Sequence, residues 1–106
     1  MYAALTTTKG KTDDPLGVAA VVAEAMHGWL SEMPGFEGFF MLVDEETDTT
    51  LVLSLWESEE IAERQRHVRL QFRDRITATV DVEVQETAGY DVVFARVESH
   101  RRSAGR

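Results

Sequence analysis

Three stretches in the first half of the chain have the residue pattern of β-strands. Residues 2–9 are rich in threonine, which favours extended structure. Residues 36–44 form a short, nearly continuous apolar run, as in a well-buried strand, and residues 49–56 follow after a polar turn. The last two stretches therefore predict an antiparallel hairpin.

Two longer stretches have the spacing of amphipathic helices. The first runs from residue 16 to 33 behind Asp14, a suitable N-cap, and Pro15, whose missing N–H has no intrahelical partner at that position. The second begins after Ser58, has carboxylates in its first turn and extends to about residue 76 or 77. The pattern predicts one uninterrupted helix in each stretch.

The end of the chain predicts two more strands. Residues 80–85 alternate valine with polar residues, a turn is expected over 86–89, and residues 90–97 are again largely apolar. The last residues, 98–106, are polar and basic, which predicts a disordered tail. Residues 1–97 are therefore expected to form one domain.

The predicted order is strand, helix, strand, strand, helix, strand, with one additional strand. This is the βαββαβ pattern of an α+β, ferredoxin-like fold, in which both helices cover one face of an antiparallel sheet. Within residues 49–56, Leu51, Leu53 and Leu55 point to one face, while Val52 and Trp56 point to the other. The face without helices is therefore apolar too, and a second copy of the chain is the simplest cover for it. We expect a homodimer.

Composition excludes several functions. The chain has 106 residues and a formal net charge of −8, which disfavours binding to nucleic acid or to an anionic membrane. It has no cysteine, so disulfides and thiolate metal sites are absent. Neither a glycine-rich phosphate loop nor a pair of histidines at metal-ligand spacing occurs, so no cofactor or metal is expected. The chain shows no signal peptide or membrane span, and a cytoplasmic location is expected.

Two short motifs resemble a known family. The segments MPGFEGF (33–39) and LSLWESEE (53–60) lead into the second strand and join the third strand to the second helix. They resemble the antibiotic biosynthesis monooxygenase family, a branch of the dimeric α/β-barrel superfamily, and the resemblance covers about residues 2–97. It implies two ferredoxin-like chains packed sheet against sheet. It also implies a pocket near Trp56, and cofactor-independent oxygenation of an aromatic or quinone-like molecule.

The functional residues of that family carry over incompletely. Its haem-degrading and phenol-oxidising branches both use an asparagine, and this chain contains none. The resemblance therefore argues against haem degradation and leaves the phenol-oxidising mechanism without one of its groups. A non-catalytic domain that binds a ligand or only dimerises is the alternative hypothesis.

Residues 64–75 contain five arginines and one histidine. On a helix, most of this charge faces water and pairs with glutamates one turn away, which explains the run without any ligand. Two residues differ. Gln65 falls on the predicted apolar face with Ile61, Val68, Phe72 and Ile76, and Arg69 borders that face. Either side chain could contact a ligand oxygen, or could instead satisfy the protein's own polar groups.

Aromatic side chains could line an apolar cavity for a small aromatic ligand, although core packing explains most of them equally well. Ser54 shares a strand face with Trp56 and could add a hydroxyl. The candidate ligand-binding residues are Trp29, Ser54, Trp56, Gln65, Arg69 and Phe72.

Overall fold

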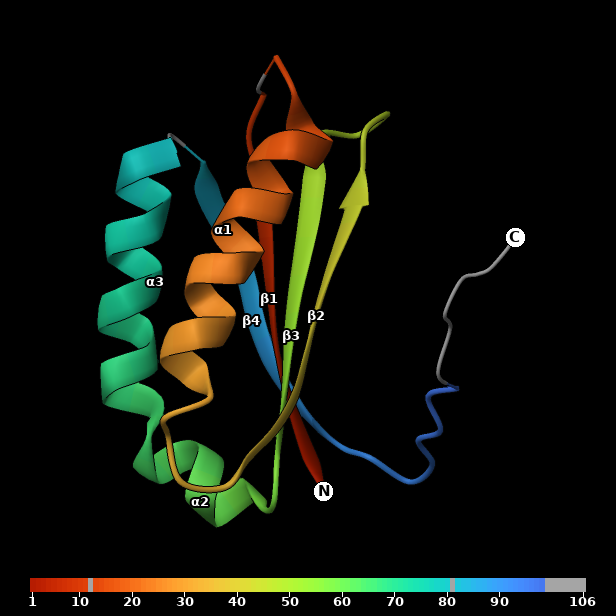
Figure 1. The fold of residues 1–106 in the computed structure, drawn as a ribbon, viewed down its shortest axis with the longest axis vertical. Coiled ribbons are helices and arrows are strands. Elements are labelled where there is room, and N and C mark those ends of the chain that lie inside the picture. Colours follow the sequence, from red (N-terminus) through yellow and green to blue (C-terminus); the bar gives the residue numbers. More distant parts are fainter. Residues whose placement is uncertain (12, 81, 99–106) are drawn as a thin grey trace.

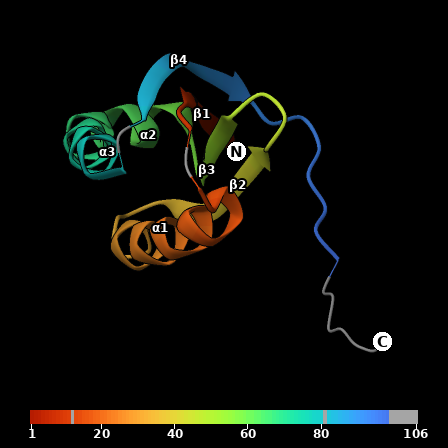
Figure 2. The same cartoon turned by 90° about the horizontal axis from the view of Figure 1, so that it is seen from above.

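A computed structural model describes residues 1–11, 13–80 and 82–98 of the chain. Over these residues, four antiparallel strands form one sheet in the order β2-β3-β1-β4, with α1 and α3 side by side on one face (Figures 1 and 2). The α+β, ferredoxin-like fold expected from the sequence is confirmed. The elements are β1 (Tyr2–Lys9), α1 (Pro15–Leu30), β2 (Phe36–Asp44), β3 (Thr49–Trp56), α2 (Glu59–Arg64), α3 (Arg66–Val80) and β4 (Glu83–Asp91).

The first three strands have the bounds that the sequence predicts. In the centre of the sheet, β1 pairs with β3 over its whole length, from Tyr2 opposite Trp56 to Lys9 opposite Thr49. Directly opposed residues of an antiparallel pair point to the same face. Alternate residues of β1 and β3 therefore face the helices, and the residues between them face away.

The predicted second helix is two helices. Ser58 caps α2 by accepting a hydrogen bond from the backbone N–H of Ile61, and the helix ends at Arg64. Gln65 lies between α2 and α3 with φ −93° and ψ −1°, outside regular α-helical geometry. The helical path bends there, so the side chains that follow are rotated relative to an uninterrupted helix. Val68, predicted on the buried face, is 44% exposed as a result.

The prediction for the end of the chain was wrong in detail. The additional strand at 90–97 is absent: one strand, β4, occupies 83–91, and residues 92–98 form no strand. The expected turn at 86–89 lies inside β4, because each of those residues pairs with β1. Gly89 allows this pairing, since a side chain there would collide with the Tyr2 hydroxyl. Of the predicted tail, residues 99–106 lie outside the described residues.

The fully buried core is small and lies where α2 meets the end of β3. Trp56 has 0% of its surface exposed, Ala62 0% and Leu30 2%. Phe36 packs edge-on against the Trp56 ring, with 5.7 Å between ring centroids. This cluster fixes the end of α1, the end of β3 and the start of α2 relative to one another. Among the described residues, no helix is both long and apolar enough to cross a membrane.

Candidate ligand cavity

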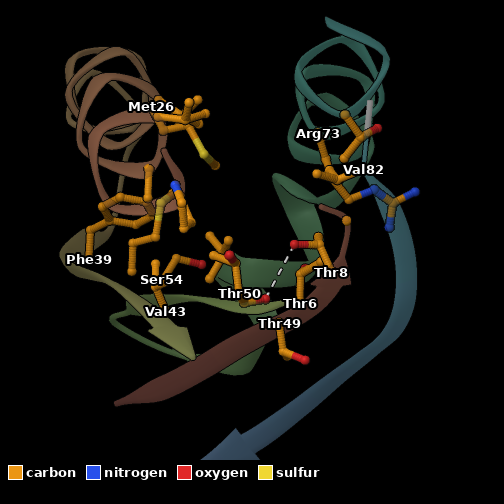
Figure 3. Close-up of a pocket in the computed structure, with 18 of the residues that line it drawn as sticks. Thr6, Thr8, Met26, Phe39, Val43, Thr49, Thr50, Ser54, Arg73 and Val82 are labelled. Carbon is orange, nitrogen blue, oxygen red and sulfur yellow. Dashed lines mark hydrogen bonds between the residues drawn. The ribbon is translucent and has the colours of Figure 1, made fainter. Parts of the chain in front are cut away.

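A cavity of about 120 Å³ lies between the sheet and the helices. Its floor consists of alternate residues of β1, β2 and β3, and its walls come from α1 and α3 (Figure 3). The lining is mostly apolar, with a few hydroxyl, guanidinium and carboxylate groups. Ligand sites are commonly concave and apolar with a small number of placed polar groups, so this cavity is the candidate site.

Strand alternation explains the floor. Residues 4, 6 and 8 of β1 and residues 50, 52 and 54 of β3 all line the cavity, as the two-residue period of a strand requires. Thr8 is buried and its hydroxyl donates to the backbone oxygen of Thr50, at 3.3 Å. The hydroxyl of Ser54 accepts a hydrogen bond of 2.8 Å from the Trp56 indole N–H. The floor therefore combines hydroxyl and apolar side chains on one face.

Arg69 is the most constrained charged residue at the cavity. One of its terminal nitrogens donates to the backbone oxygen of Ala62 at 2.9 Å. That oxygen would accept from the N–H of Arg66 if α2 and α3 were one helix, so the side chain satisfies a carbonyl near the helix break. The guanidinium also lies over the Trp56 ring, 5.3 Å from its centroid. These contacts hold Arg69 beside the cavity.

The charge of Arg69 is incompletely compensated. Its Nε is buried without a hydrogen-bond partner, and among the ion pairs of the described residues none includes Arg69. Burial lowers the pKa of the guanidinium below its ordinary value, an effect that the charge of nearby Glu63 opposes. Buried polar groups are normally satisfied, so a cation of this kind at a cavity favours an anionic or oxygen-bearing ligand.

Arg73 lies one helical turn after Arg69 and also lines the cavity. Its Nε and one terminal nitrogen donate to the same carboxylate oxygen of Asp74, at 3.1 and 2.8 Å. The Arg73 side chain is 25% exposed, whereas that of Asp74 is 67% exposed and does not line the cavity. Arg73 therefore pairs with one exposed residue, Asp74, while part of its side chain lies on the cavity wall.

The six candidate residues from the sequence separate into two groups. Trp29, Ser54 and Arg69 line the cavity. Phe72 is not among the lining residues and stacks on Trp29, with 4.1 Å between ring centroids. Neither Trp56 nor Gln65 is among the lining residues: Trp56 is fully buried beneath Arg69, and Gln65 lies at the helix break. Whether any of the six binds a ligand stays a prediction.

Sequence reasoning missed Arg73 and the threonines of β1. The sequence pattern predicts an uninterrupted helix with most of the charge of residues 64–75 in water, and Arg73 is part of that charge. The bend at Gln65 brings Arg69 and Arg73 to the cavity instead. Thr6 and Thr8 were detectable, because they alternate with Leu5 and Thr7 in a strand that the sequence predicted correctly.

A second cavity, of about 210 Å³, lies on the other side of Arg69, between α2, α3 and the strands β1 and β4. It is lined partly by Tyr2, Glu63, Arg66 and Thr87, and shares Arg69 with the first cavity. Arg66 pairs with Glu63 at 3.5 Å, on the surface. Among the described residues, no group of three or more histidine, aspartate or glutamate side chains could hold a metal ion.

The fold is shared with known oxygenase structures. A monooxygenase from the gene ActVA-Orf6 of Streptomyces coelicolor, in complex with nanaomycin D, superposes with a TM-score of 0.65 at 14% identity, covering 92% of each chain. SnoaB, a cofactor-independent oxygenase from Streptomyces nogalater, gives 0.62 at 14% identity, covering 92% of this chain and 98% of its own.

A third structure is described as a "putative antibiotic biosynthesis monooxygenase" from Nitrosomonas europaea. It gives a TM-score of 0.61 at 18% identity, covering 89% of this chain and 100% of its own. No protein-family model and no curated protein matches the sequence. The three superpositions show that the chain shares the fold of these structures.

Proposed function

We propose that this chain is an antibiotic biosynthesis monooxygenase-like enzyme that oxygenates a phenolic aromatic molecule in the cavity without a cofactor. The observation that carries the proposal is Arg69, a half-buried cation without a carboxylate partner among the described residues, on the wall of an apolar cavity. The shared fold with two oxygenases supports it.

The reaction can be balanced without an external reductant. A phenol reacts with O₂ to give a quinone and water: one oxygen atom enters the ring, and the other leaves as water with two hydrogens from the substrate. The phenol supplies the electrons, so no flavin or metal is required. Ionisation of the phenol makes electron transfer to O₂ easier, and a guanidinium beside the phenolate oxygen favours the ionised form.

The assignments follow from position. The apolar wall of α1, with Trp29 at its end, holds the rings and excludes water. Arg69 donates N–H groups to the phenolate oxygen, and the Ser54 hydroxyl lies on the floor. In this proposal Trp56 acts through Arg69 and Ser54, which it contacts, rather than on the substrate. Gln65 is given no part in ligand binding, because it lies at the break between α2 and α3 and not on the cavity lining.

Oxygen consumption tests the proposal. Purified protein is incubated with dihydroxynaphthalenes, and O₂ uptake is followed together with the quinone absorbance. We expect uptake by the wild type and a loss of about tenfold or more in Arg69→Met, since a charge-assisted hydrogen bond to the reacting oxygen is removed. Arg64→Met, on the exposed surface of α2, is the control. Absence of uptake with every substrate tried, or equal uptake in Arg69→Met, would refute the assignment.

A ligand-binding protein without catalysis is the alternative. The cavity lining contains no histidine among the described residues, and its only carboxylates are Asp44 and Asp48 near the β2–β3 turn. A general base near Arg69 is therefore not provided by the described lining. Binding of a phenol with no O₂ uptake would favour this alternative.

A homodimer is part of the proposal. The sheet face opposite the helices carries leucines of β3 and the partly exposed side chains of Phe40 (39%) and Leu42 (49%). The segment after β4 leaves the body of the protein (Figures 1 and 2), with Val93 96% and Phe94 78% exposed. Apolar surface on this scale favours a second copy as its cover. A cytoplasmic location remains part of the proposal, and cell fractionation tests it.

A further inference from the structure

The two helical walls of the cavity differ in chemistry. On α3, the lining residues Arg69, Arg73 and Thr77 follow one another at intervals of four and form a polar row, and Leu70 lines the cavity beside them. On α1, the row that faces them is apolar and consists of Val18, Val22, Met26 and Trp29. Figure 3 shows Met26 on the α1 side and Arg73 on the α3 side.

The floor is divided in the same direction. Beside α3, the cavity-lining residues of β1 include Thr6 and Thr8, whereas beside α1 those of β2 are Phe39, Met41 and Val43, with Asp44 at the end of the strand. In Figure 3, Phe39 and Met26 lie together, across the cavity from Arg73 and Thr8. The cavity is therefore apolar along α1 and β2 and carries hydroxyl and guanidinium groups along α3 and β1.

The charged groups that α3 contributes to the cavity lining are both positive. Arg69 has no carboxylate partner among the described residues, and the partner of Arg73 is an exposed carboxylate outside the lining. Two carboxylates also line the cavity, at its end near the β2–β3 turn: Asp44 and Asp48. The Oδ1 of Asp44 accepts from the backbone N–H of Glu46, and the backbone oxygen of Asp48 accepts from the backbone N–H of Gly10, just after β1. In a chain with a formal net charge of −8, two guanidinium groups on one cavity wall are a local exception.

We propose that the ligand of this cavity is an aromatic acid whose carboxylate is bound along α3. The planar, apolar body lies against α1 and β2, and the carboxylate accepts hydrogen bonds from the terminal nitrogen of Arg73 that does not donate to Asp74. The Thr77 hydroxyl, which donates to the backbone oxygen of Asp74 at 3.1 Å, lies beside this position on the lining. Arg69 remains available to the phenolic oxygen. Guanidinium groups bind carboxylates in a fixed, planar geometry, which orients the ring as well as holding it. This inference rests on the proposed function in placing an aromatic molecule here, and it adds the acidic group and the residues that recognise it.

A matched pair of ligands tests the charge. 2-Naphthoate and 2-naphthamide have the same rings and a planar substituent of similar size, but only the first is an anion at neutral pH. Isothermal titration calorimetry on the full chain gives both dissociation constants, with no need for catalysis. We expect the wild type to bind the naphthoate about tenfold or more tightly, as charge-assisted hydrogen bonds predict.

Substitution of Arg73 tests whether this residue causes the preference for the acid over the amide. In Arg73→Gln the ratio of the two dissociation constants is expected to fall towards one, mostly through weaker naphthoate binding, and Arg73→Lys is expected to restore part of it. Arg64→Gln, which removes a surface arginine paired with Glu60, is the matched control and should keep the wild-type ratio. A collapsed cavity would weaken both ligands alike and leave the ratio unchanged, so the ratio separates recognition from folding.

The inference is overturned if the wild type binds the amide as tightly as the acid, or if Arg73→Gln binds the amide as tightly as the wild type does and keeps the full preference for the acid. Either result leaves the proposed oxygenase function standing, because O₂ uptake with neutral dihydroxynaphthalenes is measured separately. Conversely, a preference for the acid that depends on Arg73, with no O₂ uptake, supports the inference while the oxygenase function fails.

Discussion

The indole N–H of Trp56 donates a 2.8 Å hydrogen bond to the hydroxyl of Ser54, two residues earlier on the same strand and face. Trp56 has 0% of its surface exposed and Ser54 7%, so neither group can exchange this partner for bulk water. The bond links the buried core at the end of β3 to the floor of the cavity.

Loss of the Ser54 hydroxyl should therefore destabilise the fold. Ser54→Ala leaves the buried indole N–H without its acceptor, at a cost of about 1–3 kcal/mol in the free energy of unfolding. Urea denaturation measures the change. In the Trp56→Phe background the same substitution should cost much less, because the donor is gone, and equal costs in both backgrounds would contradict the coupling.

Replacement of Arg69 tests whether this residue serves stability. Arg69→Met keeps much of the packing stem but removes a half-buried cation, its hydrogen bond to Ala62 and its contact with Trp56. Losing these contacts lowers the free energy of unfolding, whereas removing a desolvated charge raises it. Because the two effects oppose each other, we expect the free energy of unfolding to stay within about 1 kcal/mol of the wild-type value. Thermal and urea unfolding measure it. A decrease in the free energy of unfolding of well above about 2 kcal/mol would show that Arg69 serves mainly to stabilise the fold.

Gly35 connects α1 to β2 in a conformation that favours glycine. Its φ is +81°, and an added Cβ would collide with the side chain of Ile61 on α2. Gly35→Ala should therefore lower stability by about 1–2 kcal/mol from the backbone alone, and by more from the collision.

Gly28 provides the matched control. It lies within α1, and nothing lies within 4 Å of the position of an added Cβ. Gly28→Ala should raise stability by about 0.5–1 kcal/mol, since alanine is the better helix former. Calorimetric melting of both variants checks the opposite signs, and a stabilised Gly35→Ala would refute the strain.

The uncovered sheet face predicts self-association. Leu53 points away from the cavity, between the partner strands β1 and β2. Leu53→Glu places a charge at the centre of the proposed contact, and we expect a dimer in the wild type and a monomer in the variant. Sedimentation velocity at micromolar concentration measures both. Val21→Glu, at a 71% exposed position on α1, should leave the dimer intact. A monomeric wild type would refute the proposal.

The sequence predicted most of the fold because most of it depends on local patterns. The bounds of β1, β2 and β3 match the predicted stretches, since strand alternation and apolar runs depend only on neighbouring residues. No pattern of neighbouring residues indicates the break at Gln65, where the Arg69 side chain donates to the Ala62 carbonyl. The length of β4 depends on its pairing with β1, which no pattern within residues 80–97 indicates.

The same distinction applies to the candidate site. Strand and helix periodicity led to Ser54 and Trp29, both of which line the cavity, and their role in binding stays a prediction. Arg73 was missed because periodicity carries a face forward only while the helix is regular, and the bend at Gln65 rotates everything after it. Trp56 was expected near a ligand, but the guanidinium of Arg69 covers its ring.

Leu53 and Ser54 are neighbours along β3, yet one belongs to the uncovered face and the other to the cavity floor. A single layer of backbone therefore separates the cavity from the uncovered face of the sheet. With water on its far side, the sheet is packed on one face only, against the helices. With a second copy seated there, it becomes an inner layer held from both sides. The shape of the cavity, and hence the choice of ligand, would then depend on protein concentration.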